Sequence, residues 1–343
     1  MNEHYLYLDP TDQQEILEAG AAHFGRRAAV LEKDIWVCWA LETLFSIEGA
    51  HPMAFKGGTS LSKIYQAIHR FSEDIDITLD YRYFDNSFDP FDPQISKTQL
   101  KRANTRLKHD VHAYANEVIR PAIQRRLNDL PIQSNHPIEM DEHGEKLWIS
   151  YPSVTESNDP YLKSRVLIEL GGRNVINPNE RHIVRPDVAL LTPNVDYPTK
   201  EVTVLSIQRT FWEKATLIHV ECNRNRFSAN ANRQSRHWYD LFQLSQHSTG
   251  RTALDNRSLL EDVIRHKKIF FNASYAQYDS CLQGALQLIP TDSMLKELKS
   301  DYEKMTQAGM LYGLNPSFEA IINALQKLEH TINREHSTAP VLA

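Results

Sequence analysis

Residues 55–80 decide the fold, and they read F-K-G-G-T-S-L-S-K-I-Y-Q-A-I-H-R-F-S-E-D-I-D-I-T-L-D. A Gly-Gly-Thr-Ser turn is followed by apolar residues at helical spacing, which predicts a short helix with a buried inner face formed by Leu61, Ile64, Tyr65 and Ile68. A strand with Asp74 and Asp76 comes next. Side chains two apart on a strand point to the same face, so we expect these carboxylates to share one divalent cation.

The turn itself has the residues that a phosphate group needs. Gly57 and Gly58 allow a close backbone approach, while Thr59 and Ser60 can cap the helix and offer hydroxyl groups. Carboxylate oxygens are the ligands that Mg²⁺ prefers. A phosphate-binding turn beside a carboxylate pair predicts transfer of a nucleotidyl group from a nucleoside triphosphate (NTP). An ordinary turn beside a solvated acidic strand end is the alternative interpretation.

Composition sets the broad class of protein. The chain has 343 residues, 24% of them charged, a formal net charge of −6 and three cysteines without metal-type spacing. These values fit a soluble globular protein of two modest domains in a reducing cytosol. The polar N-terminus predicts no signal peptide, and the most apolar run, I-W-V-C-W-A-L-E-T-L-F, is too short for a membrane span. We therefore expect a cytoplasmic protein.

Periodicity divides the chain into a mixed first part and a helical second part. The fold class expected is α/β (α+β): residues 1–207 form a domain with N-terminal helices and a small mixed sheet, and residues 208–335 form a helical C-terminal domain. Strands are predicted at 163–170, 184–191 and 200–207. Helices are predicted at 11–24, begun by Thr11 or Asp12, and at 27–47, 96–128 with a break at Pro121, 208–224, 233–247, 256–271, 293–309 and 316–333.

The helix predicted at 96–128 is the most basic stretch of the chain. Lys101, Arg102, Arg106 and Lys108 are its candidate contacts to the backbone of an RNA acceptor. A solvated helix face explains the same charges. The aromatic, Asp-rich loop at 81–94 is expected either at the rim of a site or as a plain surface connection.

Two further acidic positions have both a functional and a structural interpretation. Glu169 lies on an apolar strand, where it is either a third metal ligand or the ion-pair partner of Arg165 or Arg173. The run Glu32-Lys33-Asp34 on the second helix is expected to be a surface ion-pair cluster.

Several motifs taken in order are similar to a known family. K-G-G-T-S-L-S-K-x-Y, R-F-S-E-D-I-D-I, W-E-K-A and R-x-W-Y-D-L, with E-K-D-I-W-V upstream, resemble the AbiEii/AbiGii-type nucleotidyltransferase toxins of the polymerase-β-like superfamily. The resemblance covers roughly residues 30–270. Thirteen residues separate Ser60 from Asp74, slightly more than the general superfamily spacing, and we interpret the excess as one extra helical turn.

The resemblance implies roles for individual residues. Gly57, Gly58, Thr59 and Ser60 match the family's nucleotide-binding turn, and Asp74 and Asp76 match its metal pair. Lys214 matches the lysine that holds the triphosphate, and Asp240 matches a later essential aspartate, which either positions Lys214 or acts as a base. Glu169 matches less closely. Arg70 and Arg236 are candidates for additional phosphate contacts.

The resemblance also implies substrates and partners. It implies a Mg²⁺-dependent enzyme that transfers a nucleoside monophosphate from NTP to the 3′ end of tRNA and blocks translation, together with a cognate antitoxin. Two alternatives remain open at this point. One is nucleotidylation of a protein hydroxyl, and the other is a binding module with an inactive site. The presence of Gly57, Gly58, Asp74, Asp76 and Lys214 argues against the second alternative.

Overall fold

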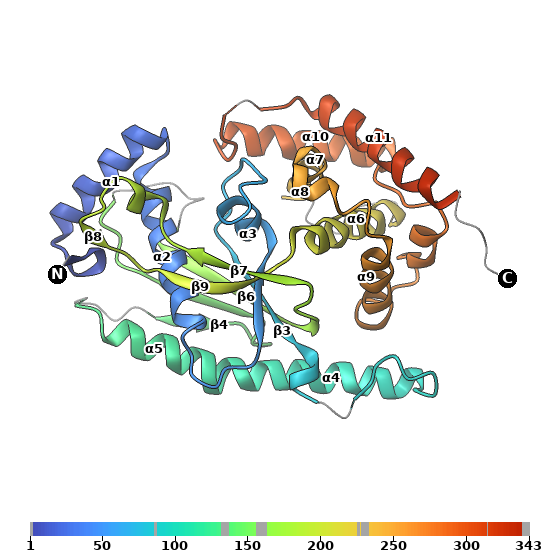
Figure 1. Ribbon diagram of the computed structural model, residues 1–343, viewed down its shortest axis with the longest axis horizontal. Coiled ribbons are helices and arrows are strands. Elements are labelled where there is room, and N and C mark those ends of the chain that lie inside the picture. Colours follow the sequence, from blue (N-terminus) through green and yellow to red (C-terminus); the bar gives the residue numbers. More distant parts are fainter. Residues whose placement is uncertain are drawn as a thin grey trace. The chain divides into compact units, whose positions relative to one another are not determined.

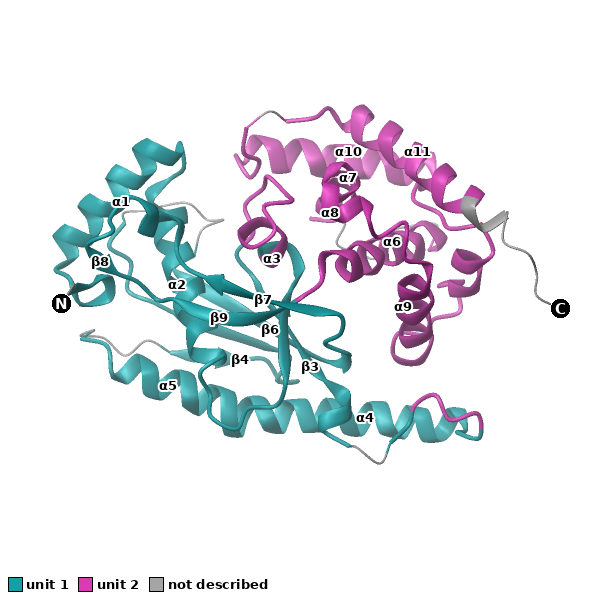
Figure 2. Cartoon of the chain, viewed as in Figure 1, with its two compact units in different colours: residues 1–59, 73–89, 94–204 teal, residues 60–72, 90–93, 205–343 magenta. Residues whose placement is uncertain are grey.

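The computed structural model describes residues 3–85, 88–131, 137–155, 163–224, 227, 233–313 and 315–337 (Figure 1). The chain forms two compact units, coloured separately in Figure 2. Residues 1–59, 73–89 and 94–204 make up the first unit, and residues 60–72, 90–93 and 205–343 make up the second. The second unit therefore takes a short segment, residues 60–72, from the middle of the stretch at 55–80.

A mixed sheet forms the centre of the first unit. Among the described residues it has seven strands in the order β4-β5-β6-β3-β2-β9-β7. The β3–β6 and β2–β9 pairs are parallel, whereas β2–β3, β4–β5 and β5–β6 are antiparallel. The mixed sheet expected from the sequence is thereby confirmed. The strands are β2 (Met53–Lys56), β3 (Ile75–Asp80), β4 (Ile138–Met140), β5 (Lys146–Ser150), β6 (Arg165–Asn174), β7 (Asn179–Val184) and β9 (Lys200–Leu205).

The predicted strand at 184–191 is wrong. Strand β7 ends at Val184, and residues Asp187–Leu190 form a 3₁₀ turn instead. Pro186 has no N–H to donate to a strand ladder, and the backbone N–H of Asp187 donates to the Asp34 carboxylate at 2.8 Å. A small parallel pair, β1 (Glu3–His4) with β8 (Val195–Asp196), lies in the same unit.

Two helices precede the sheet in sequence. Helix α1 (Pro10–Phe24) begins earlier than Thr11, because Asp9 is the N-cap and Pro10 takes the first helical position. The helix ends at Phe24, as predicted, and its C-cap Gly25 has a left-handed φ of 61°. Helix α2 (Ala28–Leu44) is buried over most of its surface.

The long basic helix is interrupted where proline predicts it. Helix α4 (Lys97–Tyr114) passes into a π-helical stretch at Ala115–Ile119, and α5 (Arg120–Asn128) has Pro121 in its first turn. Proline cannot donate the next helical hydrogen bond, so the wider π turn absorbs the break. Figure 1 shows α4 and α5 running along one side of the sheet.

The helix at the start of the second unit is shorter than predicted. Helix α3 (Gly57–Lys63) stops before Ile64, Tyr65 and Ile68, and Gln66 has a left-handed φ of 49°. The extra helical turn inferred from the motif spacing is therefore wrong. The following segment is extended instead: Phe71 N–H donates to Met310 at 2.7 Å, and Tyr312 N–H donates to His69 at 2.8 Å.

Helices form most of the rest of the second unit, as expected. They pack around buried apolar side chains that include Trp212, Trp238 and Leu241. None of the described helices of the chain has the length and apolar character that a membrane span requires. The helices of this unit after α3 are α6 (Ile207–Asn223), α7 (Ser235–Gln246), α8 (Ser248–Arg251), α9 (Arg257–Phe270), α10 (Asp292–Gln307) and α11 (Phe318–Ser337).

The contact between α4 and β6 generates a stability prediction. A β-carbon at Gly172 would overlap Cγ2 of Val111 on α4. We expect Gly172→Ala to lower the free energy of unfolding of the first unit by about 1–3 kcal/mol, measured by urea titration. Adding Val111→Ala should recover part of this loss, because the second change makes room for the new methyl group. If the double variant lost as much free energy of unfolding as the two single variants together, this packing would be contradicted.

Candidate functional site

Four charged residues lie in one row across the central strands of the first unit. In the strand register Lys56 is opposite Asp76, Asp76 is beside Glu169, and Glu169 is opposite Lys146. Register partners on neighbouring strands point to the same face of a sheet. Their apolar neighbours Ile75 and Ile77 are buried on the other face. The sheet thus brings together two of the carboxylates that the sequence selected.

Gly57 fits closely against Asp76. Its φ of 80° is a backbone conformation that residues with a β-carbon rarely adopt. A β-carbon there would also overlap the carboxylate of Asp76 and lie 2.7 Å from its Cγ. The glycine of the turn is therefore required by the acidic strand as well as by its own backbone angle.

The turn is also bonded to Asp74. The hydroxyl of Thr59 donates to the backbone carbonyl of Asp74 at 2.6 Å, and both Thr59 and Ser60 have buried side chains. The Thr59 hydroxyl therefore fixes the start of the acidic strand. Gly58 is buried beside it.

Glu169 has a partner that the sequence did not suggest. Lys146 Nζ lies 2.8 Å from its carboxylate, and this bond raises the pKa of Lys146, with Asp141 and Asp74 adding to the effect. The predicted partners are wrong, since Arg165 lies near Glu139 and Arg173 near Glu145. The charged residues that share this neighbourhood are Asp74, Asp76, Glu169, Lys56 and Lys146.

The donor set suits a hard cation, although a complete cage is not assembled. In the described part of the chain, no group of three or more His, Cys, Asp and Glu side chains is arranged to hold a metal ion. Strand β3 begins at Ile75, so Asp74 lies one residue before the strand on which it was predicted, and Asp76 lies within it. Their carboxylate oxygens are ligands of the kind that Mg²⁺ takes together with water and substrate phosphates. Glu169 could join them by exchanging its bond to Lys146 for the metal.

The Glu32-Lys33-Asp34 run is not a surface cluster. Lys33 is buried, forms an ion pair with Glu73 and donates to the carbonyl of Lys163 at 3.1 Å. Glu32 is buried too and accepts bonds from Ser153, Val154 and Thr155, while burial raises its pKa. Lys33 thereby ties α2 to the residue before Asp74, a link that helical periodicity alone does not reveal.

Asp240 is the centre of a buried charge cluster in the second unit. Its carboxylate, fully excluded from solvent, accepts from Arg70 Nε at 2.6 Å and Nη2 at 2.8 Å and lies 2.8 Å from Lys214 Nζ. Burial alone would raise the pKa of Asp240, but the charges of Arg70 and Lys214 lower it well below the usual range. A carboxylate with so low a pKa is a poor base, so the geometry favours its role as a partner of Lys214.

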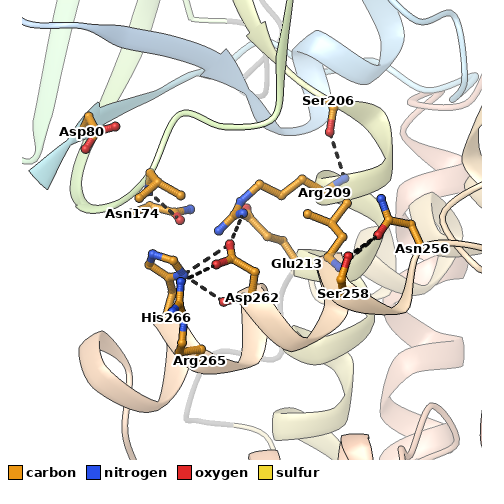
Figure 3. A network of polar contacts seen from close by, with 12 residues as sticks. Asp80, Asn174, Ser206, Arg209, Glu213, Asn256, Ser258, Asp262, Arg265 and His266 are labelled. Carbon is orange, nitrogen blue, oxygen red and sulfur yellow. Dashed lines mark hydrogen bonds and ion pairs between the residues drawn. The ribbon is translucent and has the colours of Figure 1, made fainter. Parts of the chain in front are cut away.

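A second buried ion-pair network lies in the same unit (Figure 3). Arg209 on α6 is 1% exposed and places Nη1 2.7 Å from Asp262 on α9. His266 Nδ1 lies 2.8 Å from the backbone oxygen of Asp262. The side-chain bonds to His266 and Arg209 lower the pKa of Asp262 despite its partial burial. This network joins α6 to α9 and contains no residue of the predicted site.

The candidate RNA contacts are exposed on α4. Lys101, Arg102 and Lys108 face solvent, and Arg106 does so while lying 3.3 Å from Asp85. Their exposure satisfies a requirement for contacting a large acceptor, and it fits a solvated face equally well. In the loop at 81–94, residues 81–83 form a 3₁₀ turn, and residues 86–87 lie outside the described residues.

Comparisons with known proteins are consistent with these motifs. The family model described as "Nucleotidyl transferase AbiEii toxin, Type IV TA system" matches residues 39–324. Among solved structures, the nucleotidyltransferase toxin MenT4 of Mycobacterium tuberculosis H37Rv is 12% identical, with a TM-score of 0.39, over 96% of this chain and 98% of that one. The search of curated proteins returned no match.

The buried charge on Asp240 generates a pH prediction. Removing it with Asp240→Asn leaves two buried cations without their anion, so we expect a loss of about 3 kcal/mol or more at pH 7. Because the folded-state pKa of Asp240 is lowered, its stabilisation is complete above about pH 5 and declines as the pH falls below about 4, where the unfolded carboxyl takes up a proton. Urea titrations of both proteins from about pH 3 to 7 measure the difference.

The control for that measurement is Glu319→Gln. Glu319 pairs with Lys299 on the exposed surface, 2.6 Å away. Its removal should change stability little at any pH, since solvent screens such a pair. A difference between wild type and Asp240→Asn that stayed constant down to about pH 3 would contradict the assignment of the buried charge.

Proposed function

The chain belongs to the AbiEii family of nucleotidyltransferase toxins, and from this membership and its site we propose that it transfers a nucleoside monophosphate from NTP to the 3′ end of tRNA, with Mg²⁺ as cofactor. The observation that carries the proposal is the alignment of Asp76 with Glu169 on one face of the sheet, with Gly57 fitted against Asp76. The family is a toxin family of type IV toxin–antitoxin systems, which implies an antitoxin partner and an NTP substrate.

The carboxylates supply the metal side of this proposal. Asp74 and Asp76 would hold Mg²⁺, and Glu169 would join them when Lys146 releases it. When bound, the ion would supply charge neutralisation for the phosphates of the NTP. The bond from Thr59 to the backbone carbonyl of Asp74 would hold the backbone at Asp74, and the close fit of Gly57 would limit where the Asp76 carboxylate can lie before substrate arrives.

The phosphate side uses the turn and Lys214. Because Thr59 already donates to Asp74 and Ser60 is buried, the turn would contact the triphosphate through its backbone N–H groups at Gly57 and Gly58. Lys214 is a compact cation, which suits the β- or γ-phosphate. Asp240 would hold the Lys214 ammonium in position.

The reaction balances as a single displacement. The oxygen of an acceptor hydroxyl attacks the α-phosphorus, and the bond from that phosphorus to the bridging oxygen of the β-phosphate breaks. Pyrophosphate leaves, and the hydroxyl proton passes to solvent. We propose that transfer to tRNA in this way blocks translation.

Removal of the metal ligand tests the catalytic assignment. We expect Asp76→Asn to lower transfer of labelled NMP by at least about 10²-fold, because a hard charged ligand is lost. Gly57→Ala should have a similar effect, since its methyl group would displace the Asp76 carboxylate. Circular dichroism would check that both variants fold. The matched control is Glu201→Gln, an exposed acid on β9 of the same sheet. Full activity in Asp76→Asn would contradict the site.

Charge reversal on α4 tests the acceptor. If the acceptor is tRNA, Lys101→Glu with Arg102→Glu, extended to Arg106 and Lys108, should raise KM for tRNA and weaken its salt dependence, while NTP binding changes little. The control is Lys296→Glu with Lys304→Glu, two exposed lysines on α10. An unchanged KM for tRNA would favour the alternative interpretation, in which the basic residues of α4 form a solvated face. Labelling of total protein instead of tRNA would favour a protein hydroxyl as acceptor.

A further inference from the structure

Arg70 is a residue of the second unit whose chemistry the proposed function leaves unused. It comes from the extended segment after α3, where its backbone bridges to Leu311. Its side chain is 5% exposed. Two guanidinium nitrogens bond to Asp240, and the third, Nη1, donates to the Phe71 carbonyl at 3.0 Å. These three bonds fix the orientation of the guanidinium, so Arg70 is held in place by the protein rather than free to turn toward a phosphate.

Asp240 divides its negative charge between two cations. A lysine paired with one buried carboxylate forms a neutral pair, which has little attraction for an incoming anion. Here the carboxylate is shared by Lys214 and by Arg70, which bonds to it through two nitrogens, so Lys214 is not the one cation on which the carboxylate acts. Asp240 can therefore hold Lys214 in place without consuming the charge that Lys214 needs for a phosphate.

His237, one helical turn before Asp240 on α7, reports the same local field. Its buried Nδ1 has no hydrogen-bond partner among the described residues. Burial lowers its pKa well below the usual value, and the charges of Lys214, Arg236 and Arg70 lower it further, with Asp240 acting against them. Lys214 and Arg70 therefore act on this imidazole together with Arg236.

We propose that Arg70 is a positioning residue that neutralises Asp240 and thereby leaves the charge of Lys214 available to the triphosphate of the NTP. This inference rests on the proposed nucleotidyl transfer and assigns Arg70 a role other than the phosphate contact that the sequence suggested. The arrangement predicts that the two residues compensate each other: loss of the Arg70 charge is harmful only while Asp240 is charged.

A mutant cycle with inorganic tripolyphosphate and NTP as probes tests this compensation. Arg70→Met should weaken binding of both probes by about tenfold or more in calorimetry, because the uncompensated carboxylate then cancels the charge of Lys214. Arg70→Met with Asp240→Asn should bind more tightly than Arg70→Met alone, since that carboxylate is gone. Arg70→Lys keeps the charge but loses the bidentate geometry, so it should bind between wild type and Arg70→Met.

A split between binding and turnover distinguishes positioning from mere stability. The double variant should regain affinity and yet keep a low kcat, because an uncharged amide in place of the Asp240 carboxylate no longer holds Lys214 as firmly. The matched control is Arg209→Met, which removes the other buried arginine of an Arg–Asp pair described in this unit (Figure 3). It should lower stability and leave probe affinity unchanged. All binding is measured below the unfolding transition of the least stable variant.

The outcomes separate this inference from the proposed function. Arg70→Met could lower probe affinity by the same factor in the wild-type protein and in Asp240→Asn. That result would mean that Arg70 contacts phosphate directly, and it would overturn the inference. Unchanged affinity in Arg70→Met, or wild type that binds no tripolyphosphate, would overturn it too. Wild type that binds the probes and shows the compensation but transfers nothing to any acceptor would uphold the role of Arg70 and refute the proposed function.

Discussion

The contact between the backbone of Gly57 and the carboxylate of Asp76 is the constraint on which the first unit's site depends. Strand β2 ends at Lys56, and the chain must turn at once into α3 across the neighbouring strand β3. The turn lies so close to β3 that no β-carbon fits between them. The Gly57-Gly58 turn and the acidic strand are therefore one structural element, and neither could change its position without moving the other.

Buried ion pairs hold the surrounding parts in register. An isolated buried charge is costly, and Lys33 and Arg70 each have a partner of opposite sign. Lys33 fixes Glu73, which precedes Asp74, and Arg70 fixes Asp240. Such pairs add little to net stability when compared with apolar packing. Removing one partner, however, lowers the free energy of unfolding strongly, because the other charge is left buried without compensation. Their contribution here is to specify which segments lie together, including the segment at 60–72 that joins the second unit.

The sequence predicted the parts of the fold that depend on local pattern. Alternation placed Asp76 and Glu169 on strands, and the glycine pair marked the turn. Partners distant in sequence were not predictable, since spacing shows which face a side chain takes but not what covers that face. Lys146 beside Glu169 and Arg70 beside Asp240 are such cases. The helix extended to Ile68 was wrong because tertiary bonds to residues 310–312 outweigh helical periodicity in that segment.

Each of the two charge clusters combines carboxylates with cations, and its composition suits the chemistry proposed for it. In the first unit three carboxylates share a neighbourhood with two lysines, and these residues are Asp74, Asp76, Glu169, Lys56 and Lys146. In the second unit Asp240 is shared by Arg70 and Lys214. Carboxylates suit a hard cation such as Mg²⁺, whereas lysine and arginine suit a phosphate group. Within each cluster the opposite charges offset part of the cost of burying one another, so each cluster is compatible with a folded unit before any ligand binds.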